Sequence, residues 1–284
     1  MSDGAPSSIR LGRFTFDVRT AGPADGTPVV LLHGFPETSW SWRHQIDALA
    51  DAGYRVVAPD QRGYSPGARP RDVASYRLSE LVADVIRLAD HEDLGRFHLV
   101  GHDWGAMVAW FVASQHADRL RSLTTISVPH PGAYREALRT LRSGQAVRSI
   151  YAGIFQIPGI ERVMLARGGA GFRASLRRTG LSAEEADHYG ELMRDRAVLG
   201  AALNWYRAVR PADFKDLGPV TVPTLHVWST GDPALSRTGA ESTGKYVDGP
   251  YRFEVLDGIS HWIPEQAPEV TNRLLLEHFA AHPD

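Results

Sequence analysis

The chain has 284 residues, and 31 Lys and Arg oppose 33 Asp and Glu, which gives a formal net charge of −2. This near balance argues against a nucleic-acid partner and against a basic membrane-binding face. Cysteine is absent, which excludes disulfides, thiolate catalysis and cysteine-based metal sites. A polar N-terminus and the lack of any apolar stretch of membrane-spanning length predict no secretory signal and no membrane span, and the composition favours the cytoplasm.

The apolar pattern predicts a mostly parallel sheet. Residues 9–19 alternate between apolar and polar and predict a strand or hairpin. A continuous apolar run at 29–32 is typical of a strand buried on both faces, and further buried strands are predicted at 54–60 and 97–100. Strand patterns also occur at 123–128, 224–228 and 251–256. Helical patterns cover 40–52, 78–92, a segment that ends near 117, and 267–281.

Between about residues 129 and 213 the pattern changes, because the segment is rich in Arg, Ala and Leu and contains no convincing strand. It predicts several helices inserted between two parts of one α/β sheet, whose mostly parallel strands are flanked by helices. We therefore expect a first core part at 1–128, a helical cap at 129–213 and a second core part at 214–284. The cap is expected over the carboxyl ends of the strands, where open α/β sheets bind ligands.

The segment Gly101-His102-Asp103-Trp104-Gly105 follows a predicted strand and precedes a predicted helix, which is the arrangement of a nucleophile elbow. The turn is so tight that the residues two positions from its centre must be small, and Gly101 and Gly105 meet that need. The central residue is Asp103, whose carboxylate would form an ester by displacement at an sp³ carbon. Taken alone, the same string is typical of a helix cap.

Two further residues give Asp103 a catalytic context. Asp232 and His261 each come directly after a predicted strand, at the same edge of the sheet as Asp103. Their order along the chain, nucleophile, acid and histidine, is that of the α/β-hydrolase fold. His261 would activate the water that hydrolyses the ester, and Asp232 would orient the imidazole. The loop His33-Gly34-Phe35-Pro36 is expected to supply one oxyanion-hole N–H from Phe35, with a second from Trp104.

These motifs resemble the epoxide hydrolases of the α/β-hydrolase superfamily over nearly the whole chain, from about residue 9 to 281. The resemblance implies two cap tyrosines whose hydroxyls hold the epoxide oxygen. One is Tyr206, in Asn204-Trp205-Tyr206-Arg207, and the other is Tyr151, which precedes Phe155-Gln156-Ile157-Pro158-Gly159. Residues beside the motif positions are expected to line the substrate pocket, and these are His33, Pro36, His102 and Trp262.

The resemblance implies a small-molecule epoxide and water as reactants, with no metal or organic cofactor. The sequence leaves a monomer and a homodimer open. A haloalkane dehalogenase shares the Asp nucleophile and the following Trp, but it resembles His-Gly-Asn-Pro, and Phe35 cannot replace the halide-binding Asn. A fluoroacetate dehalogenase typically has Arg where Trp104 stands. A non-catalytic ligand-binding homologue is disfavoured by the intact triad, and a serine esterase by the lack of a Gly-x-Ser-x-Gly elbow.

Overall fold

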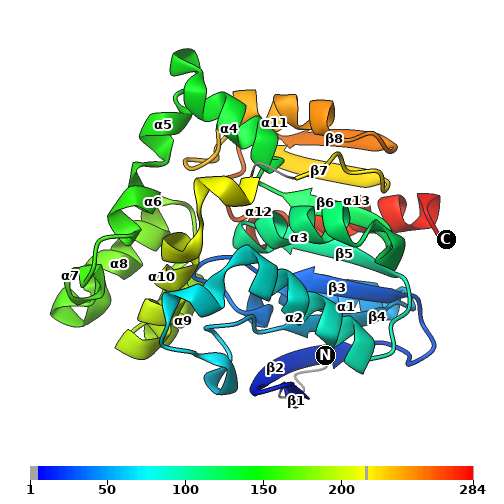
Figure 1. The fold of residues 1–284 in the computed structure, drawn as a ribbon, viewed down its shortest axis with the longest axis horizontal. Coiled ribbons are helices and arrows are strands. Elements are labelled where there is room, and N and C mark those ends of the chain that lie inside the picture. Colours follow the sequence, from blue (N-terminus) through cyan, green and yellow to red (C-terminus); the bar gives the residue numbers. More distant parts are fainter. Residues whose placement is uncertain (1–5, 215–216, 284) are drawn as a thin grey trace.

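The computed structural model describes residues 6–214 and 217–283. Within them, eight strands form one sheet in the order β1-β2-β4-β3-β5-β6-β7-β8 (Figure 1). The strands are β1 (Ser7–Leu11), β2 (Phe14–Ala21), β3 (Pro28–Leu32), β4 (Arg55–Pro59), β5 (Phe97–His102), β6 (Leu120–Ile126), β7 (Thr224–Ser229) and β8 (Tyr251–Leu256). β2 pairs antiparallel with β1 and β4, whereas all other pairs are parallel. The predicted N-terminal hairpin and the mostly parallel sheet are therefore confirmed.

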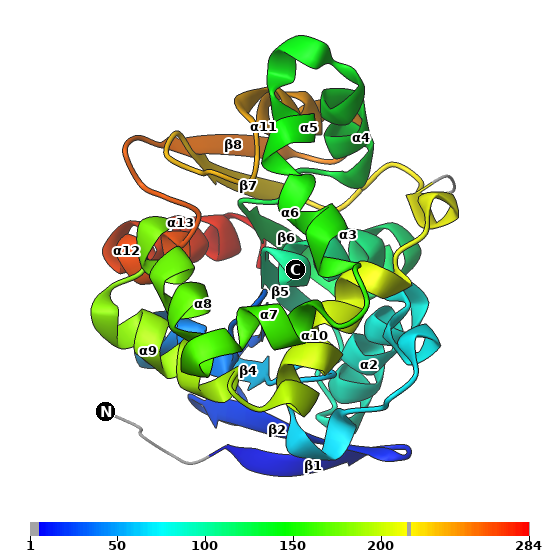
Figure 2. The same cartoon turned by 90° about the vertical axis from the view of Figure 1, so that its left-hand side faces the viewer.

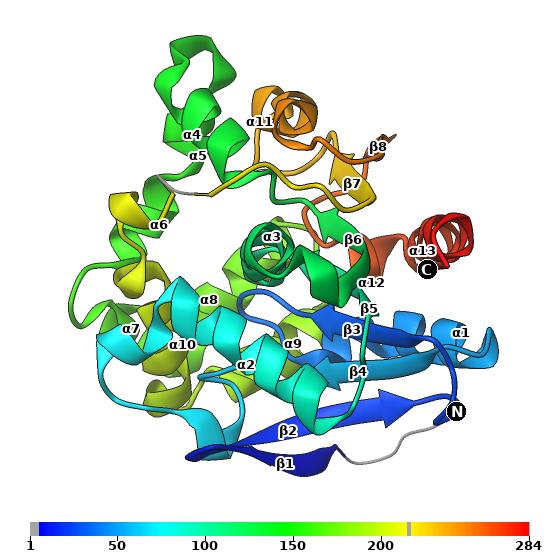
Figure 3. The ribbon, with the colours of Figure 1, turned by 45° about the vertical axis from the view of Figure 1, so that its right-hand side comes forward.

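Helices cover both faces of the sheet (Figure 3). One face carries α1 (Arg43–Asp51) and α13 (Pro268–Ala281), and the other carries α2 (Leu78–His91) and α3 (Trp104–Gln115). Because successive side chains of a strand point to opposite faces, β3 contributes to two cores. Val29 and Leu31 pack with α1 and α13, whereas Val30 and Leu32 pack with α2 and α3. Burial on both faces explains the continuous apolar runs of the central strands.

The segment between β6 and β7 is helical. Residues 129–213, all of which the structure describes, contain no strand. The helices are α4 (Pro131–Arg139), α5 (Gln145–Arg148), α6 (Ile150–Phe155), α7 (Ile160–Met164), α8 (Ala166–Arg178), α9 (Ala183–Leu192) and α10 (Arg196–Ala208). In Figure 2, α6, α7, α8 and α10 lie in front of the ends of the central strands. The predicted helical character of this segment is confirmed.

Several short elements escaped the periodicity analysis. The predicted helix at 40–52 is a 3₁₀ turn, η1 (Ser39–Trp42), followed by α1. The remaining short helices are η2 (Pro66–Ala68), η3 (Val73–Tyr76), η4 (Ala117–Arg119), η5 (Leu141–Ser143), η6 (Pro211–Phe214), α11 (Arg237–Ser242), η7 (Thr243–Tyr246) and α12 (Ile263–Gln266). Such elements span too few residues to show a period. Across the described ranges, no helix combines the length and apolarity needed to cross a membrane.

Candidate active site

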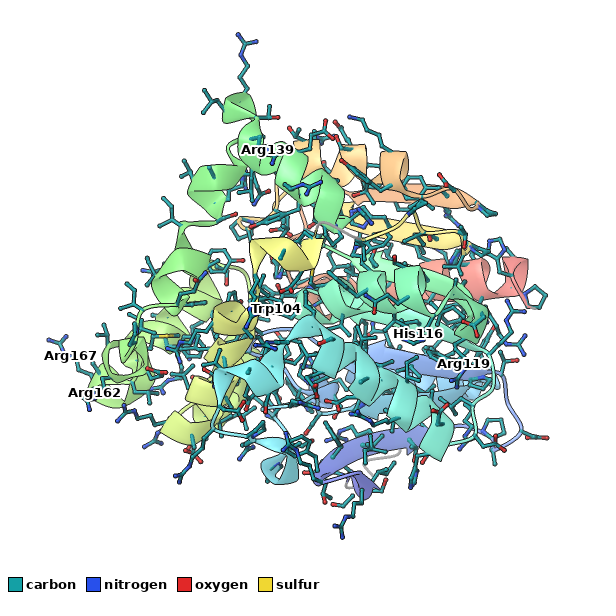
Figure 4. The ribbon with its side chains drawn as sticks, in the orientation of Figure 1. Trp104, His116, Arg119, Arg139, Arg162 and Arg167 are labelled. Atoms are coloured by element: carbon teal, nitrogen blue, oxygen red, sulfur yellow. The ribbon has the colours of Figure 1, made fainter. Side chains whose placement is uncertain are left out.

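Asp103 occupies a sharp turn between β5 and α3. Its φ of 49° and ψ of −119° lie outside the regions that non-glycine residues normally adopt, which is typical of strain held at a functional site. A Cβ at Gly101 would overlap the carbonyl of Gly105, and a Cβ at Gly105 would overlap the carbonyl of Leu32. Figure 4 shows Trp104 at the start of α3, toward the helical segment, and His116 at the opposite end of that helix. The two glycines thus permit the turn that places the Asp103 side chain beyond the ends of the strands.

The Asp103 carboxylate is held between a backbone donor and an imidazole. The Phe35 N–H donates to Oδ1 at 2.8 Å, and Nε2 of His261 lies 3.4 Å from Oδ2. Gly34 is required at its position because a Cβ there would overlap the Asp103 side chain. Trp104 is the first residue of α3, where backbone N–H groups have no acceptor within the helix. The backbones of Phe35 and Trp104 therefore flank Asp103, and their predicted role as oxyanion-hole donors remains a prediction.

His261 and Asp232 come together from the loops that follow β8 and β7. Nδ1 of His261 lies 2.8 Å from Oδ2 of Asp232. The other oxygen of Asp232 accepts the backbone N–H groups of Ala234 and Leu235, at 2.7 Å and 2.9 Å. Asp103, Asp232 and His261 are only 7%, 1% and 6% exposed. The three predicted residues form one buried chain of hydrogen-bonding groups.

The charges of this chain stabilise one another. Burial alone would lower the pKa of His261, but the charge of Asp232 and the contact with Asp103 outweigh it and raise that pKa well above 6.5. Burial would likewise raise the pKa of Asp103, yet the hydrogen bond and charge of His261 hold it below its usual value. Both shifts favour an ionised Asp103 beside a protonated His261.

A cavity of about 440 Å³ opens above Asp103 and His261. Its wall contains both predicted tyrosines, Tyr151 from α6 and Tyr206 from α10, and the centroids of their rings lie 6.3 Å apart. Burial, and then the charge of Asp103, raises the pKa of each phenol well above 10. Both hydroxyls are therefore protonated and can donate a hydrogen bond into the cavity.

The predicted pocket residues divide into two pairs. Pro36 and Trp262 line the cavity, whereas His33 and His102 do not and must be corrected. His33 is buried beneath its loop, where its ring accepts the Gln61 N–H at 3.0 Å. The ring of His102 lies between the carboxylate of Glu37, at 3.0 Å, and the carbonyl of His261, at 2.9 Å. Each histidine is next to a motif residue in the chain, but its side chain points away from the cavity.

Most of the apolar residues in the cavity wall were not predicted from the sequence. These residues come from α6, α7 and α8 and are Phe155, Val163, Met164, Phe172 and Leu176. The position of Phe155 four residues after Tyr151, on the same face of a helix, was the one available signal. Glu37 was also missed as a support for the site. Its buried carboxylate accepts the Gly34 N–H at 2.8 Å, in the loop that contacts Asp103.

The polar groups of the cavity are few. Besides Asp103, His261 and the two tyrosines, the wall contains the hydroxyls of Ser175 and Thr179. In the part of the chain that the structure describes, no group of three or more histidine or carboxylate side chains could hold a metal ion. The arrangement offers a carboxylate nucleophile, an imidazole and two phenol donors around a largely apolar space.

Known proteins resemble the chain in both sequence and structure. The family model for the alpha/beta hydrolase fold matches residues 27–268. The AB hydrolase superfamily protein YfhM of Bacillus subtilis is 37% identical over 280 residues, which cover 95% of this chain and 96% of that protein. Epoxide hydrolase A of Mycobacterium tuberculosis is 38% identical in an alignment 292 positions long, which covers 88% of this chain and 90% of that protein.

A solved structure supports the same relationship. It comes from work on novel epoxide hydrolases of the alpha/beta hydrolases superfamily in metagenomes from hot environments, and it matches with a TM-score of 0.86 at 31% identity. The match covers 98% of this chain and 99% of that one. These similarities extend through the core and the helical segment alike and confirm the expected α/β-hydrolase fold. The chain belongs to the epoxide hydrolase family of the α/β-hydrolase fold superfamily.

Proposed function

We propose that this chain hydrolyses a small-molecule epoxide to a vicinal diol. The observation that carries the proposal is the shared cavity of Asp103, His261, Tyr151 and Tyr206. A carboxylate can attack an epoxide carbon, but the leaving oxygen then gains charge and needs hydrogen-bond donors. Two protonated phenols opposite a carboxylate meet that need. The epoxide hydrolases among the relatives support the same reaction.

In the first step, Asp103 attacks one ring carbon and the C–O bond to that carbon breaks. The product is a hydroxyalkyl ester on Asp103, and Tyr151 or Tyr206 protonates the freed oxygen. Esterification removes the negative charge of Asp103, which is one of the groups that raise the pKa of His261. The pKa of His261 therefore falls, and the proton it releases replaces the one that the phenol gave up.

In the second step, the neutral His261 takes a proton from water and the resulting hydroxide attacks the ester carbonyl. Asp232 stabilises the imidazolium through the 2.8 Å contact with Nδ1. The N–H groups of Phe35 and Trp104 stabilise the oxyanion, since Phe35 already donates to Oδ1 of Asp103. Collapse of the intermediate passes the second water proton to the leaving alkoxide, which releases the diol and restores the Asp103 carboxylate and the protonated His261. Every bond change is assigned to these side chains and water, so the proposal includes no metal or organic cofactor.

We also propose that the helical segment, residues 129–213, acts as a cap on a core made of residues 1–128 and 214–284. Supporting evidence is the origin of the cavity wall, because Tyr151, Phe172 and Tyr206 come from α6, α8 and α10. The rings of Tyr206 and Phe172 also pack against Phe35 of the core, at 5.6 Å and 6.2 Å between ring centroids. The cap thus supplies the epoxide-binding hydroxyls and separates the site from bulk solvent.

A substrate panel tests the proposal. Epoxides and haloalkanes of similar size are incubated with the enzyme, and diol and halide release are measured for each. We expect diol from epoxides and little halide, because the Phe35 side chain has no donor for a halide. The Asp103→Ala variant is the control and should form neither product. Halide release that matches or exceeds diol release would instead assign the site to haloalkane hydrolysis.

A further inference from the structure

One face of the helical segment exposes an unusual amount of apolar surface. Seven of the nine exposed large apolar side chains among the described residues fall between positions 138 and 163. Leu141 is 97% exposed, Val147 72% and Val163 69%. The apolar strip, as we name it, consists of Leu141, Val147, Ile150, Ile154, Ile157 and Val163. The helices α5, α6 and α7, which carry four of these residues, form the left-hand edge of the molecule in Figure 1 and face the viewer in Figure 2.

The same segment is strongly basic although the whole chain is not. Residues 131–171 contain six arginines and two glutamates, a formal charge of +4, against −2 for the complete chain. Both glutamates are neutralised from outside the segment, Glu136 by Lys245 at 2.9 Å and the buried Glu161 by Arg207 at 2.7 Å. Five arginines are exposed and have no ion-pair partner within the described ranges: Arg135, Arg139, Arg142, Arg162 and Arg167.

Arginines lie at both ends of the helical segment, since Figure 4 shows Arg139 at one end and Arg162 and Arg167 at the other. Figure 4 shows Arg162 and Arg167 at the outer edge of the helical segment, directed away from the body of the molecule. Arg142 and Arg162 are each the sequence neighbour of a strip residue, Leu141 and Val163. The surface therefore combines protruding aliphatic side chains with unpaired cations, and monomeric proteins rarely expose such a patch without a partner.

The face also adjoins the catalytic cavity. Val163 is at once a member of the strip and part of the cavity wall, as is the neighbouring Met164. Gly171, further along the chain, is exposed and lines the same cavity. Between them, residues 167–169 have left-handed φ values that interrupt the helix. A hydrophobic molecule held against this face would lie beside the wall of the substrate cavity.

We propose that this face binds the surface of an anionic lipid bilayer and takes lipophilic substrates from it. Anionic headgroups attract clustered arginines, and exposed aliphatic side chains enter the boundary between headgroups and acyl chains. Each positive charge of a protein near such a surface strengthens its binding to the bilayer about fivefold. Five exposed arginines therefore give an affinity for anionic lipid that the near-neutral charge of the whole chain does not predict. The vesicle-binding part of the proposal stands independently of the epoxide chemistry.

A second copy of the chain is the competing occupant of this face. In a symmetric dimer the same patch meets itself, so the arginines of one copy would face those of the other. No acidic side chain of the segment is available to separate them, because Glu136 and Glu161 are already paired. Like charges in contact disfavour association, whereas an anionic lipid surface complements them.

Flotation with vesicles tests the proposal on the full chain. One vesicle set is phosphatidylcholine alone and the other contains phosphatidylcholine with phosphatidylglycerol. We expect binding to the anionic set only, and we expect salt to weaken it. The variants Arg142→Ser/Arg162→Ser/Arg167→Ser and Leu141→Ser/Val147→Ser should each bind at least about tenfold more weakly. The charge-matched control Arg10→Ser/Arg87→Ser/Arg273→Ser changes exposed arginines of the core and should bind like the parent.

Two results would overturn the proposal. The first is absence of binding to anionic vesicles, or equal loss of binding in the control triple variant. The second is a dimer in sedimentation velocity that Leu141→Ser/Val147→Ser dissociates, which would assign the face to a second copy. Circular dichroism establishes that each variant is folded. Vesicle binding by a chain that forms no diol would sustain the vesicle-binding part of this proposal and refute the proposed function, so the two failures are distinguishable.

Discussion

Nε2 of His261 lies 3.4 Å from Oδ2 of Asp103, so the imidazole and the proposed nucleophile form one buried ion pair. This ion pair affects the order of the two chemical steps. While Asp103 is charged it keeps His261 protonated, and a protonated imidazole cannot activate water. Formation of the ester therefore lowers the pKa of His261 and favours its action as a base, while Asp232 continues to raise that pKa.

The first prediction concerns this coupling. Asp103→Asn removes the carboxylate charge with little change of shape and imitates the uncharged ester. We expect the pKa of His261 to fall relative to the parent chain, because Asp103 is one of the groups that raise it. Imidazole chemical shifts followed by NMR across a pH series measure the change. An unaltered His261 pKa in the variant would contradict the proposed switch.

The same coupling predicts a pH dependence of stability. The folded-state pKa of His261 is raised above its unfolded value of about 6.5, so its stabilising contribution is fully present below that pH. This contribution is lost as the pH rises through the raised pKa. The difference in unfolding free energy between the parent and Asp103→Asn should therefore shrink above neutral pH. Urea unfolding at several pH values measures it, and a difference that grows with pH would oppose the assignment.

A third prediction separates the two chemical steps. His261→Gln retains a polar side chain but cannot take a proton from water, so the ester should form and then persist. We expect turnover to fall by at least about 10²-fold, which is typical of a lost general base. Intact-protein mass spectrometry should show an adduct with the mass of the epoxide. Turnover at the parent rate would mean that another group activates the water.

The tyrosines are tested by removal of single hydroxyls. Tyr206→Phe and Tyr151→Phe should each lower kcat for epoxide opening by about 10²-fold, since each loses a donor to the developing oxyanion. Tyr134→Phe is the matched control, because its hydroxyl bonds Ser149 at 2.7 Å and Tyr134 lies outside the cavity wall. Steady-state kinetics with one epoxide compares all three. Equal rates for Tyr206→Phe and Tyr134→Phe would remove Tyr206 from the mechanism.

The tight turn around Asp103 leads to a prediction about the free energy of unfolding. Gly105→Ala places a Cβ against the Leu32 carbonyl, and such overpacking costs about 1–3 kcal/mol or more. Gly153→Ala is the control, because no heavy atom lies within 4 Å of a Cβ there and alanine favours the α6 helix. The free energies of unfolding in urea should fall for the first variant and stay level or rise for the second. Comparable stability of the two would mean that the turn tolerates a larger residue.

The sequence predicted the parts of the site that depend on local order. Asp103, Asp232 and His261 each follow a strand of the sheet, and parallel strands bring their carboxyl ends to one edge. Their distances therefore follow from the sheet, and the glycines around Asp103 follow from the tight turn. Tyr151 and Tyr206 came from the family resemblance alone, because nothing in helical periodicity distinguishes a donor in a cavity from a packed tyrosine.

The features of the site that could not be predicted from the sequence depend on side-chain direction and helix packing. His33 and His102 lie next to motif residues, but adjacent residues at a strand end point to different sides. The walls contributed by Phe172 and Leu176 depend on how α8 lies over the sheet, which no local pattern encodes. The basic face was likewise hidden, because a near-neutral total charge says nothing about where the arginines collect.

The central claim is the covalent ester on Asp103, and a single turnover in ¹⁸O-labelled water tests it most directly. With enzyme in excess over epoxide, the oxygen atom that is added to the epoxide carbon in the first diol comes from the Asp103 carboxylate. We predict an unlabelled first diol and ¹⁸O in the peptide that contains Asp103. Label in the diol of the first turnover, with none in that peptide, would show direct attack by water and would contradict the account.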